Sequence, residues 1–216
     1  MRLGLTATLG ILATLAIAAT AFLFAPKARS SDPMQPVAIT LGGEKLNIPA
    51  GYLRPDSRQG GAMDALELAA LFPGFTPAGE TRDIDARTDL SDRFARVVFV
   101  TARPSDLSLD PAERPARLYA RFLDQTSWSH PGGLTARAFE DGSPFEGDEL
   151  FYVAPEGREF AARCRKPDPS RKTPNTCISV FRLGDLDIEM RFSAGLLSDW
   201  EKLRDGARGL IEAARR

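Results

Sequence analysis

A chain of 216 residues with 43% hydrophobic and 26% charged side chains can bury a sizeable core, which excludes a disordered protein. The net charge of −1 is unevenly distributed, because residues 1–29 hold three basic and no acidic side chains, whereas the remainder holds 25 basic and 29 acidic ones. A mildly acidic domain lacks the positive surface that nucleic-acid binding requires, so we expect no nucleic acid as a partner.

An uncharged apolar segment without proline runs from residue 3 to residue 25. A helix of that length spans about 34 Å, enough to cross a bilayer core of about 30 Å. Residues 1–25 are therefore predicted to anchor the chain in the inner membrane by a single pass through residues 3–25, uncleaved. A cleaved signal peptide, which would leave a soluble periplasmic protein, is the alternative, with Ala19-Thr20-Ala21 as a possible cleavage site. Residues 26–36, which hold three prolines, are predicted to be a linker.

Residues 37–216 are predicted to form one periplasmic domain that begins with a β-hairpin. Two β-like runs in 37–48 flank a Gly-Gly pair, a connection typical of hairpins, and the hairpin would pair Ile39 with Leu46. Residues 63–72 are ambiguous between helix and strand, with a slight preference for strand. Residues 95–102 form a continuous apolar run of strand length and are predicted to be a buried strand.

Residues 110–125 are predicted to form a helix in the middle of the domain. Asp110 can cap the first turn and Pro111 suits the first helical position. Pro115 must also lie within the first turn, so the regular helix can begin later than Asp110 indicates. One apolar face would follow, made of Leu118, Tyr119, Phe122 and Leu123.

The rest of the domain is predicted to be a meander that closes with a helix. In its last strand, apolar and charged residues alternate, and the Gly184-Asp185 turn places Leu183 opposite Leu186. The closing helix is predicted from a capping box at Ser198 and Glu201. The predicted strands are 134–139, 149–154, 158–164, 177–183 and 186–192, and the apolar face of the helix is Leu196, Trp200, Leu203, Ala207, Leu210 and Ala214.

The only two cysteines, Cys164 and Cys177, flank a basic, proline-containing loop. The strand alternation places both on the same apolar face of adjacent strands, where Cβ atoms lie about 4.5–5.5 Å apart. We therefore predict a disulfide bond between them. Disulfides persist in oxidising compartments, which favours a periplasmic domain. Two buried free thiols in a cytosolic domain remain the alternative.

The sequence contains no strong catalytic, cofactor-binding or metal-binding motif. The single histidine, His130, precedes a proline and two glycines and is interpreted as a surface turn residue. The acidic segment 140–149 could gather a calcium ion, but its spacing does not match the EF-hand pattern and a solvated turn is the better interpretation. We predict no catalytic residue, no cofactor and no metal ligand.

Three short stretches carry a resemblance: "IPAGYLR" (48–54), "LELAALFPGF" (66–75) and "FSAGLLSDWEKL" (192–203). With the apolar N-terminal segment, they resemble uncharacterised membrane-anchored envelope proteins of proteobacteria and, more loosely, the PsbP-like α+β fold. The resemblance implies a binding or assembly role without catalytic residues.

The expected fold class is α+β: an N-terminal transmembrane helix, then one antiparallel sheet, hairpin plus C-terminal meander, packed by the mid-chain helix and the C-terminal helix. The expected function is a membrane-anchored periplasmic domain that is no enzyme and binds an envelope protein or a small ligand. The alternatives are an immunity or inhibitor protein, and an envelope hydrolase that uses two carboxylates with at least one perturbed pKa.

Overall fold

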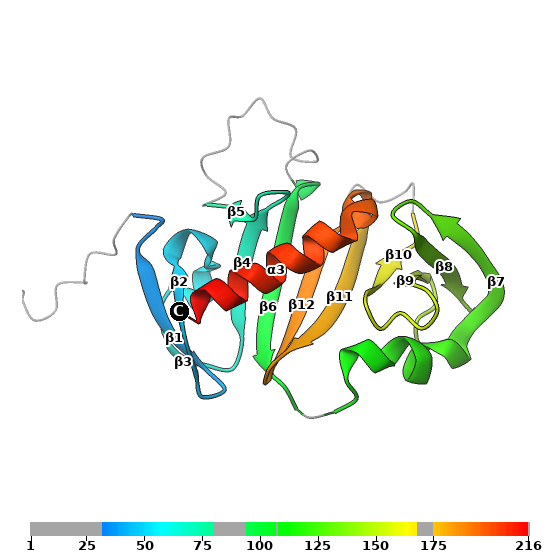
Figure 1. Ribbon diagram of the computed structural model, residues 1–216, viewed down its shortest axis with the longest axis horizontal. Helices are drawn as coiled ribbons and strands as arrows, with labels where there is room; N and C mark the ends of the chain where they lie inside the picture. The colour runs from blue at the N-terminus through cyan, green and yellow to red at the C-terminus, as the bar shows by residue number, and fades with distance from the viewer. Residues whose placement is uncertain (1–31, 80–93, 107, 168–174, 216) are drawn as a thin grey trace, which may run out of the picture. The chain divides into compact units, whose positions relative to one another are not determined.

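The computed structural model describes residues 32–79, 94–106, 108–167 and 175–215, and these form mostly antiparallel β-sheet (Figure 1). A three-stranded sheet has the order β2-β1-β3, and a nine-stranded sheet has the order β5-β4-β6-β12-β11-β10-β9-β8-β7. Every neighbouring pair in the larger sheet is antiparallel. The predicted α+β class is therefore wrong, because sheet dominates the described residues and α3 is the one α-helix described in full.

The predicted N-terminal hairpin is confirmed. It consists of β1 (Pro36–Leu41) and β2 (Glu44–Pro49), with β3 (Gly61–Met63) parallel to β1. Ile39 lies opposite Leu46, as the alternation predicts. Gly42 and Gly43 both have positive φ angles, +58° and +89°, which explains why two glycines occupy the turn.

The strands of the predicted meander are confirmed as β8 to β12, although β10 begins three residues later than expected. The ambiguous segment 63–72 contains a strand, β4, as preferred. Strands β5 and β7 at the two edges of the sheet were not predicted. The bounds are β4 (Leu66–Leu71), β5 (Thr76–Pro77), β6 (Val97–Pro104), β7 (Leu123–His130), β8 (Leu134–Phe139), β9 (Asp148–Val153), β10 (Ala161–Arg165), β11 (Thr176–Leu183) and β12 (Leu186–Ser193).

The predicted mid-chain helix is wrong. Residues Pro111–Glu113 form a 3₁₀ turn, Pro115–Tyr119 a π turn and Ala120–Phe122 a second 3₁₀ turn, after which β7 begins at Leu123. Pro115 lacks the N–H that an α-helix needs and interrupts the regular hydrogen-bond ladder. The predicted cap at Asp110 does form, since its carboxylate accepts a hydrogen bond from the Ala112 N–H at 2.9 Å.

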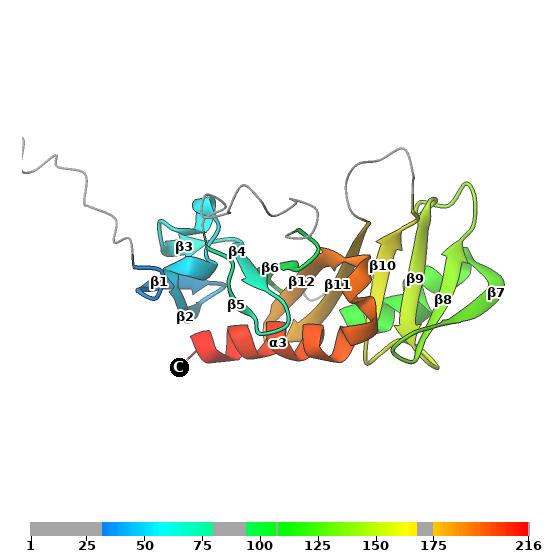
Figure 2. The same ribbon diagram turned by 90° about the horizontal axis from the view of Figure 1, so that it is seen from above.

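The C-terminal helix α3 (Trp200–Ala214) is confirmed and lies along one face of the nine-stranded sheet (Figure 2). The predicted capping box does not form, because a 3₁₀ turn, Ala194–Asp199, precedes α3 and is capped by Ser193. Two further 3₁₀ turns, Ala50–Tyr52 and Pro55–Ser57, lie between β2 and β3. The α3 side chains buried against the core are Trp200, Leu203, Ala207, Ile211 and Ala214.

The transmembrane helix predicted for residues 3–25 lies outside the described residues, as does most of the linker. Within the part of the chain that the structure describes, no helix is long and apolar enough to cross a bilayer.

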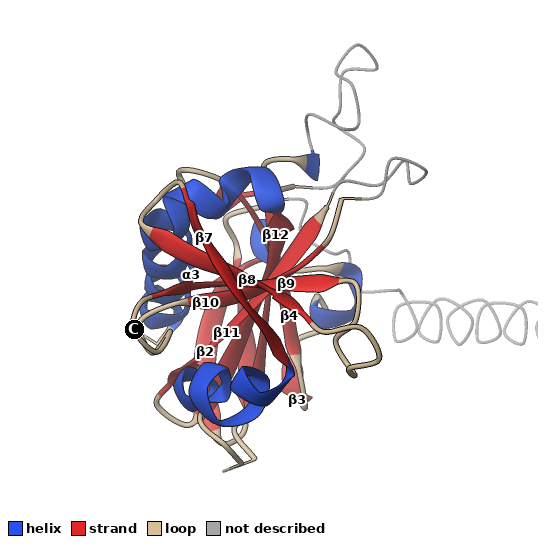
Figure 3. Cartoon of the chain, turned by 90° about the vertical axis from the view of Figure 1, so that its right-hand side faces the viewer, coloured by secondary structure: helices blue, strands red, loops and turns tan. Residues whose placement is uncertain are grey.

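The strand alternation divides the nine-stranded sheet into two faces. Residues such as Leu68, Val100 and Met190 point into the main core, which also contains the buried side chains of α3. A second, smaller cluster of Leu123, Phe139 and Leu150 lies beneath residues 111–122. In Figure 3, which is seen from the β7 edge, α3 runs along one side of the strands. We call the face of the nine-stranded sheet that lies opposite to α3 the far face.

Candidate functional site on the far face of the sheet

The far face combines charged and half-buried apolar side chains from the central strands. One cross-strand row joins Thr101 of β6, Glu189 of β12 and Val180 of β11. A parallel row runs through Phe99, Arg191, Ile178 and Arg163. These residues alternate with the buried ones in β6, β10, β11 and β12, so the strand geometry itself brings them side by side.

A cavity of about 210 Å³ lies where residues 111–119 meet the far face. Its floor is apolar, and prolines and an aromatic ring from the 111–119 segment form one wall. Four charged residues line it, three arginines and one glutamate. The floor is Leu150, Ala161, Ile178 and Val180; the wall is Pro111, Pro115 and Tyr119; the charged residues are Arg114, Arg163, Arg191 and Glu189.

The three arginines of the cavity differ in how far acidic side chains neutralise their charges. Arg191 forms an ion pair with Glu189, with 2.7 Å between Nε and Oε1. Arg163 pairs with Asp148 at 3.2 Å and its guanidinium lies over the ring of Phe145. The Arg114 guanidinium has no hydrogen bond or ion pair among the residues that the structure describes. The cavity therefore carries an excess of positive charge.

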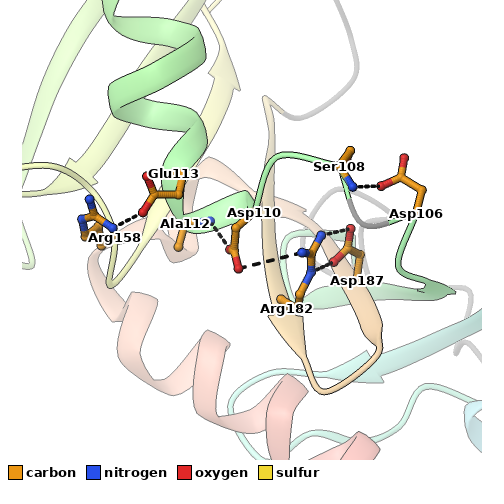
Figure 4. Close-up of polar contacts among 8 residues, drawn as sticks. All are labelled: Asp106, Ser108, Asp110, Ala112, Glu113, Arg158, Arg182 and Asp187. Carbon is orange, nitrogen blue, oxygen red and sulfur yellow. Dashed lines mark hydrogen bonds and ion pairs between the residues drawn. The ribbon is translucent and has the colours of Figure 1, made fainter.

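A second polar cluster lies beside the cavity and ties the segment before it to the sheet (Figure 4). Arg182 of β11 donates two hydrogen bonds to Asp187 of β12, at 2.7 and 3.2 Å, and lies 4.0 Å from the Asp110 carboxylate. The hydrogen bond to Asp187 raises the pKa of Arg182 most; partial desolvation opposes it, and the charges of Asp187, Asp110 and Asp106 reinforce it. At the other end of the segment, Glu113 pairs with Arg158. These contacts position residues 110–113 over the far face.

Asp106 lies at the start of this segment. Its carboxylate accepts a hydrogen bond from the backbone N–H of Ser108 at 2.9 Å (Figure 4). Hydrogen bonds to Ser108, the side-chain one first, lower the pKa of Asp106, and Arg114 adds a smaller electrostatic effect in the same direction.

The predicted site residues Cys164 and Cys177 lie on the other face, away from the cavity. A disulfide bond joins them, they lie directly opposite each other in β10 and β11, and both are buried in the main core. Their burial in the same core cluster as Phe160 and Trp200 indicates a structural role.

The other residues considered in the sequence do not converge on the cavity. The ring of His130 packs edge-on against Phe151 at 5.0 Å and contacts the carbonyl oxygen of Pro131. Residues 140–149 form a turn in which Glu146 accepts a hydrogen bond from Gly142. No group of three or more potential ligands that could hold a metal ion occurs among the described residues.

Sequence reasoning missed the three arginines of the cavity. Arg191 and Glu189 belong to the polar side of a strand whose alternation was recognised, so they could have been placed on the far face. Arg114 gives no such signal, because the apolar spacing of its segment predicts a helix that does not form.

No protein-family model and no curated protein matches this chain. Two of the solved structures that share its fold are the following. An immunity protein of the Stenotrophomonas maltophilia type IV secretion system, Smlt3025, superimposes with a TM-score of 0.58 and 15% identity, over 84% of this chain and 93% of that one. The iron-regulated outer membrane lipoprotein FrpD of Neisseria meningitidis gives a TM-score of 0.51 and 13% identity, over 86% and 96%.

At these identities the likeness shows the fold alone. Both neighbours are proteobacterial, and one is a lipoprotein of the outer membrane. The resemblance to envelope proteins of proteobacteria is thus supported at a coarse level, whereas neither structure supports the resemblance to the PsbP-like fold.

Proposed function

We propose that this chain is an immunity protein of the bacterial cell envelope, a domain without catalytic activity that binds and blocks a toxic protein. The observation that carries the proposal is the fold shared with the Stenotrophomonas maltophilia immunity protein over 93% of that protein's length. The sequence leaves this function as an alternative to a general binding role, and the fold likeness favours it.

The far face is the surface that we propose for the partner. Its charged side chains, Glu189 in one row and Arg191 and Arg163 in the next, give the specificity that a toxin inhibitor needs, because a wrongly charged partner is repelled. Half-buried apolar side chains such as Val180 and Ile178 lie between the charges and can be covered on binding. The opposite face is filled by α3 and the main core, and is not available to a partner.

We place the domain, residues 37–216, in the periplasm. The disulfide bond between Cys164 and Cys177 supports an oxidising compartment. In this proposal the N-terminal apolar segment directs export and is removed, which is the soluble alternative of the sequence analysis. Mass spectrometry of the mature protein tests this: a chain that still carries residues 1–25 would contradict it.

The two other functions fit the cavity less well. A binding site for a small molecule usually has a volume of roughly 300–1,000 Å³, whereas this cavity has about 210 Å³. A hydrolase that uses two carboxylates needs two acids in one cleft. Glu189 is the one acid among the described residues that line this cavity, and it is ion-paired to Arg191.

Co-expression tests the proposal. The full-length chain is produced in a bacterial host together with the protein that the neighbouring gene encodes. That neighbouring protein is directed to the periplasm. We expect the neighbouring protein to arrest growth alone and the present chain to restore growth and to co-purify with it. If the present chain is expressed but protects the host against none of the proteins that adjacent genes encode, the immunity function is excluded.

Matched variants then test the surface. Ile178→Glu adds a charge to the far face, and Ala213→Glu adds the same charge to the exposed side of α3. We expect Ile178→Glu to abolish protection and Ala213→Glu to preserve it, with thermal unfolding confirming that both variants fold. Equal protection by both would place the partner elsewhere.

A further inference from the structure

The Arg114 guanidinium is a cation that the described residues leave without a partner. It is half-buried and lines the cavity, and no described hydrogen bond or ion pair engages it. By contrast, Arg117, less than one helical turn further along, is paired with Glu113 at 2.9 Å. The Arg114 charge acts on the Asp106 carboxylate, where it is the smallest of the effects that lower the pKa, but no described hydrogen bond or ion pair joins the two. A partly desolvated guanidinium without a hydrogen-bonded carboxylate gains from any anion that reaches it, since charge-assisted hydrogen bonds are about twice as strong as neutral ones.

The neighbouring charges set how many negative charges the cavity can accept. The Arg191–Glu189 pair is neutral, and Asp148 is shared between Arg163 and Arg165, at 3.2 and 3.1 Å. Arg163 is therefore compensated only in part. Glu189 also lies in the cavity and repels a multiply charged anion more than a singly charged one. The charges favour a single carboxylate.

The apolar floor of the cavity favours a carboxylate that is attached to a short aliphatic chain. Ile178 and Val180 form part of the floor beneath the arginines. A short chain of methylene groups would cover them while its charged end stays at the rim. The volume of about 210 Å³ suits one or two protein side chains rather than a whole ligand.

We propose that this cavity receives an acidic side chain, a glutamate or an aspartate, from the protein that binds the far face. Arg114 is the residue that pairs with the incoming carboxylate, and Arg163, whose charge is compensated only in part, adds to the positive surroundings. The proposal rests on the proposed function for the nature of the partner, but the preference for a carboxylate rests on the residues of the cavity alone.

The chemistry can be tested without the partner. The full-length protein, labelled with ¹⁵N, is titrated with N-acetyl-glutamate N-methylamide, with its neutral glutamine counterpart and with inorganic phosphate, while the Nε–H resonances of the arginines are followed by NMR. We expect saturable shifts of Arg114 with the glutamate compound and none with the glutamine compound. Arg114→Gln should weaken this binding at least about fivefold, because a charge-assisted hydrogen bond is lost at a partly exposed site.

Arg117→Gln is the matched control, because Arg117 does not line the cavity and its side chain is 70% exposed. It should leave binding of the glutamate compound unchanged. Equal responses to the glutamate and glutamine compounds, tighter binding of phosphate, or equal losses in the two variants would each overturn the proposal. If carboxylate binding at Arg114 persists while co-expression gives no protection, the proposed function fails and the cavity chemistry stands. Protection without carboxylate binding refutes the cavity proposal alone.

Discussion

Gly206 of α3 packs directly against the ring of Phe75, so closely that a Cβ atom at Gly206 would overlap the ring. The backbone conformation of Phe75 and one hydrogen bond to its carbonyl oxygen define its position. Its φ angle is +48°, unusual for a residue other than glycine, and its carbonyl oxygen accepts a hydrogen bond from the Tyr52 hydroxyl at 2.9 Å. The helix therefore approaches the sheet edge only because position 206 has no side chain.

Gly206→Ala should destabilise the protein although alanine is the better helix former. We expect a loss of about 1–3 kcal/mol, because the added methyl group overpacks a filled site. Gly209→Ala is the matched control: it lies on the same helix, is exposed, and a Cβ there would meet nothing within 4 Å. That variant should gain up to about 1 kcal/mol from helix propensity. Chemical denaturation of both variants measures the difference, and stabilisation by Gly206→Ala would contradict the packing.

The disulfide bond should contribute to stability. Replacing both Cys164 and Cys177 with alanine frees a loop with a sequence separation of 13 residues. We expect a loss of about 2–4 kcal/mol and a melting temperature lower by several degrees.

A reductant should lower the melting temperature of the wild-type protein in the same way and leave that of the double variant unchanged. Thiol counting on unfolded, unreduced protein provides the direct check. Two free thiols would show that the bond is not formed.

The parts of the fold that could be predicted from the sequence are those fixed by local alternation. Strands β8 to β12 have short turns and one buried face, so their pattern identifies them. Strand β7 could not be found this way: Leu123 is its one buried residue, and the others are exposed or half-buried at the free edge of the sheet. An exposed edge strand needs no apolar alternation.

The cavity could not be predicted because it depends on contacts between distant segments. Arg114 comes from a segment whose apolar spacing resembles that of a helix but whose Pro115 prevents one. Its place in the same cavity as Arg191 follows from the way residues 110–113 are tied to the sheet by Arg182 and Asp110. No local pattern in the sequence reports that contact.

Trp200→Phe should destabilise the protein more than the same change at the other tryptophan. Trp200 is buried, stacks on Phe160 with 5.1 Å between ring centroids, and donates its indole N–H to the Gly132 carbonyl at 2.9 Å. Losing that hydrogen bond and part of the ring should cost about 1–2 kcal/mol. Trp128 is 40% exposed. Trp128→Phe should therefore change the free energy of unfolding by less than about 0.5 kcal/mol. Equal losses would contradict the difference in burial.

The lowered pKa of Asp106 predicts that part of the protein's stability is lost at acidic pH. Hydrogen bonds to Ser108 lower this pKa from the ordinary value of 3.8, so the folded state favours the charged carboxylate. The stabilisation is present above pH 3.8 and is lost as the pH falls through the lower pKa of the folded state. Asp106→Asn keeps an acceptor oxygen but has no charge to titrate, so its stability should decline less steeply below pH 3.8. An NMR titration of the carboxyl group gives its pKa directly, and a value at or above 3.8 would contradict this account.

The Arg182–Asp187 pair should couple more strongly than the Arg191–Glu189 pair, although both lie on the far face. Arg182 and Asp187 are direct cross-strand neighbours, joined by two hydrogen bonds, with side chains 21% and 17% exposed. Arg191 and Glu189 lie on one strand and share a single hydrogen bond, and the arginine side chain is 56% exposed.

Double-mutant cycles, with each arginine changed to methionine and each acid changed to its amide, measure the two coupling energies. We expect about 1 kcal/mol for the cross-strand pair and less than about 0.5 kcal/mol for the exposed one. High salt should weaken the exposed pair more, because solvent ions screen it more effectively. A coupling energy for Arg191–Glu189 that equals or exceeds the other would show that exposure and two-point contact do not decide the strength of ion pairs on this face.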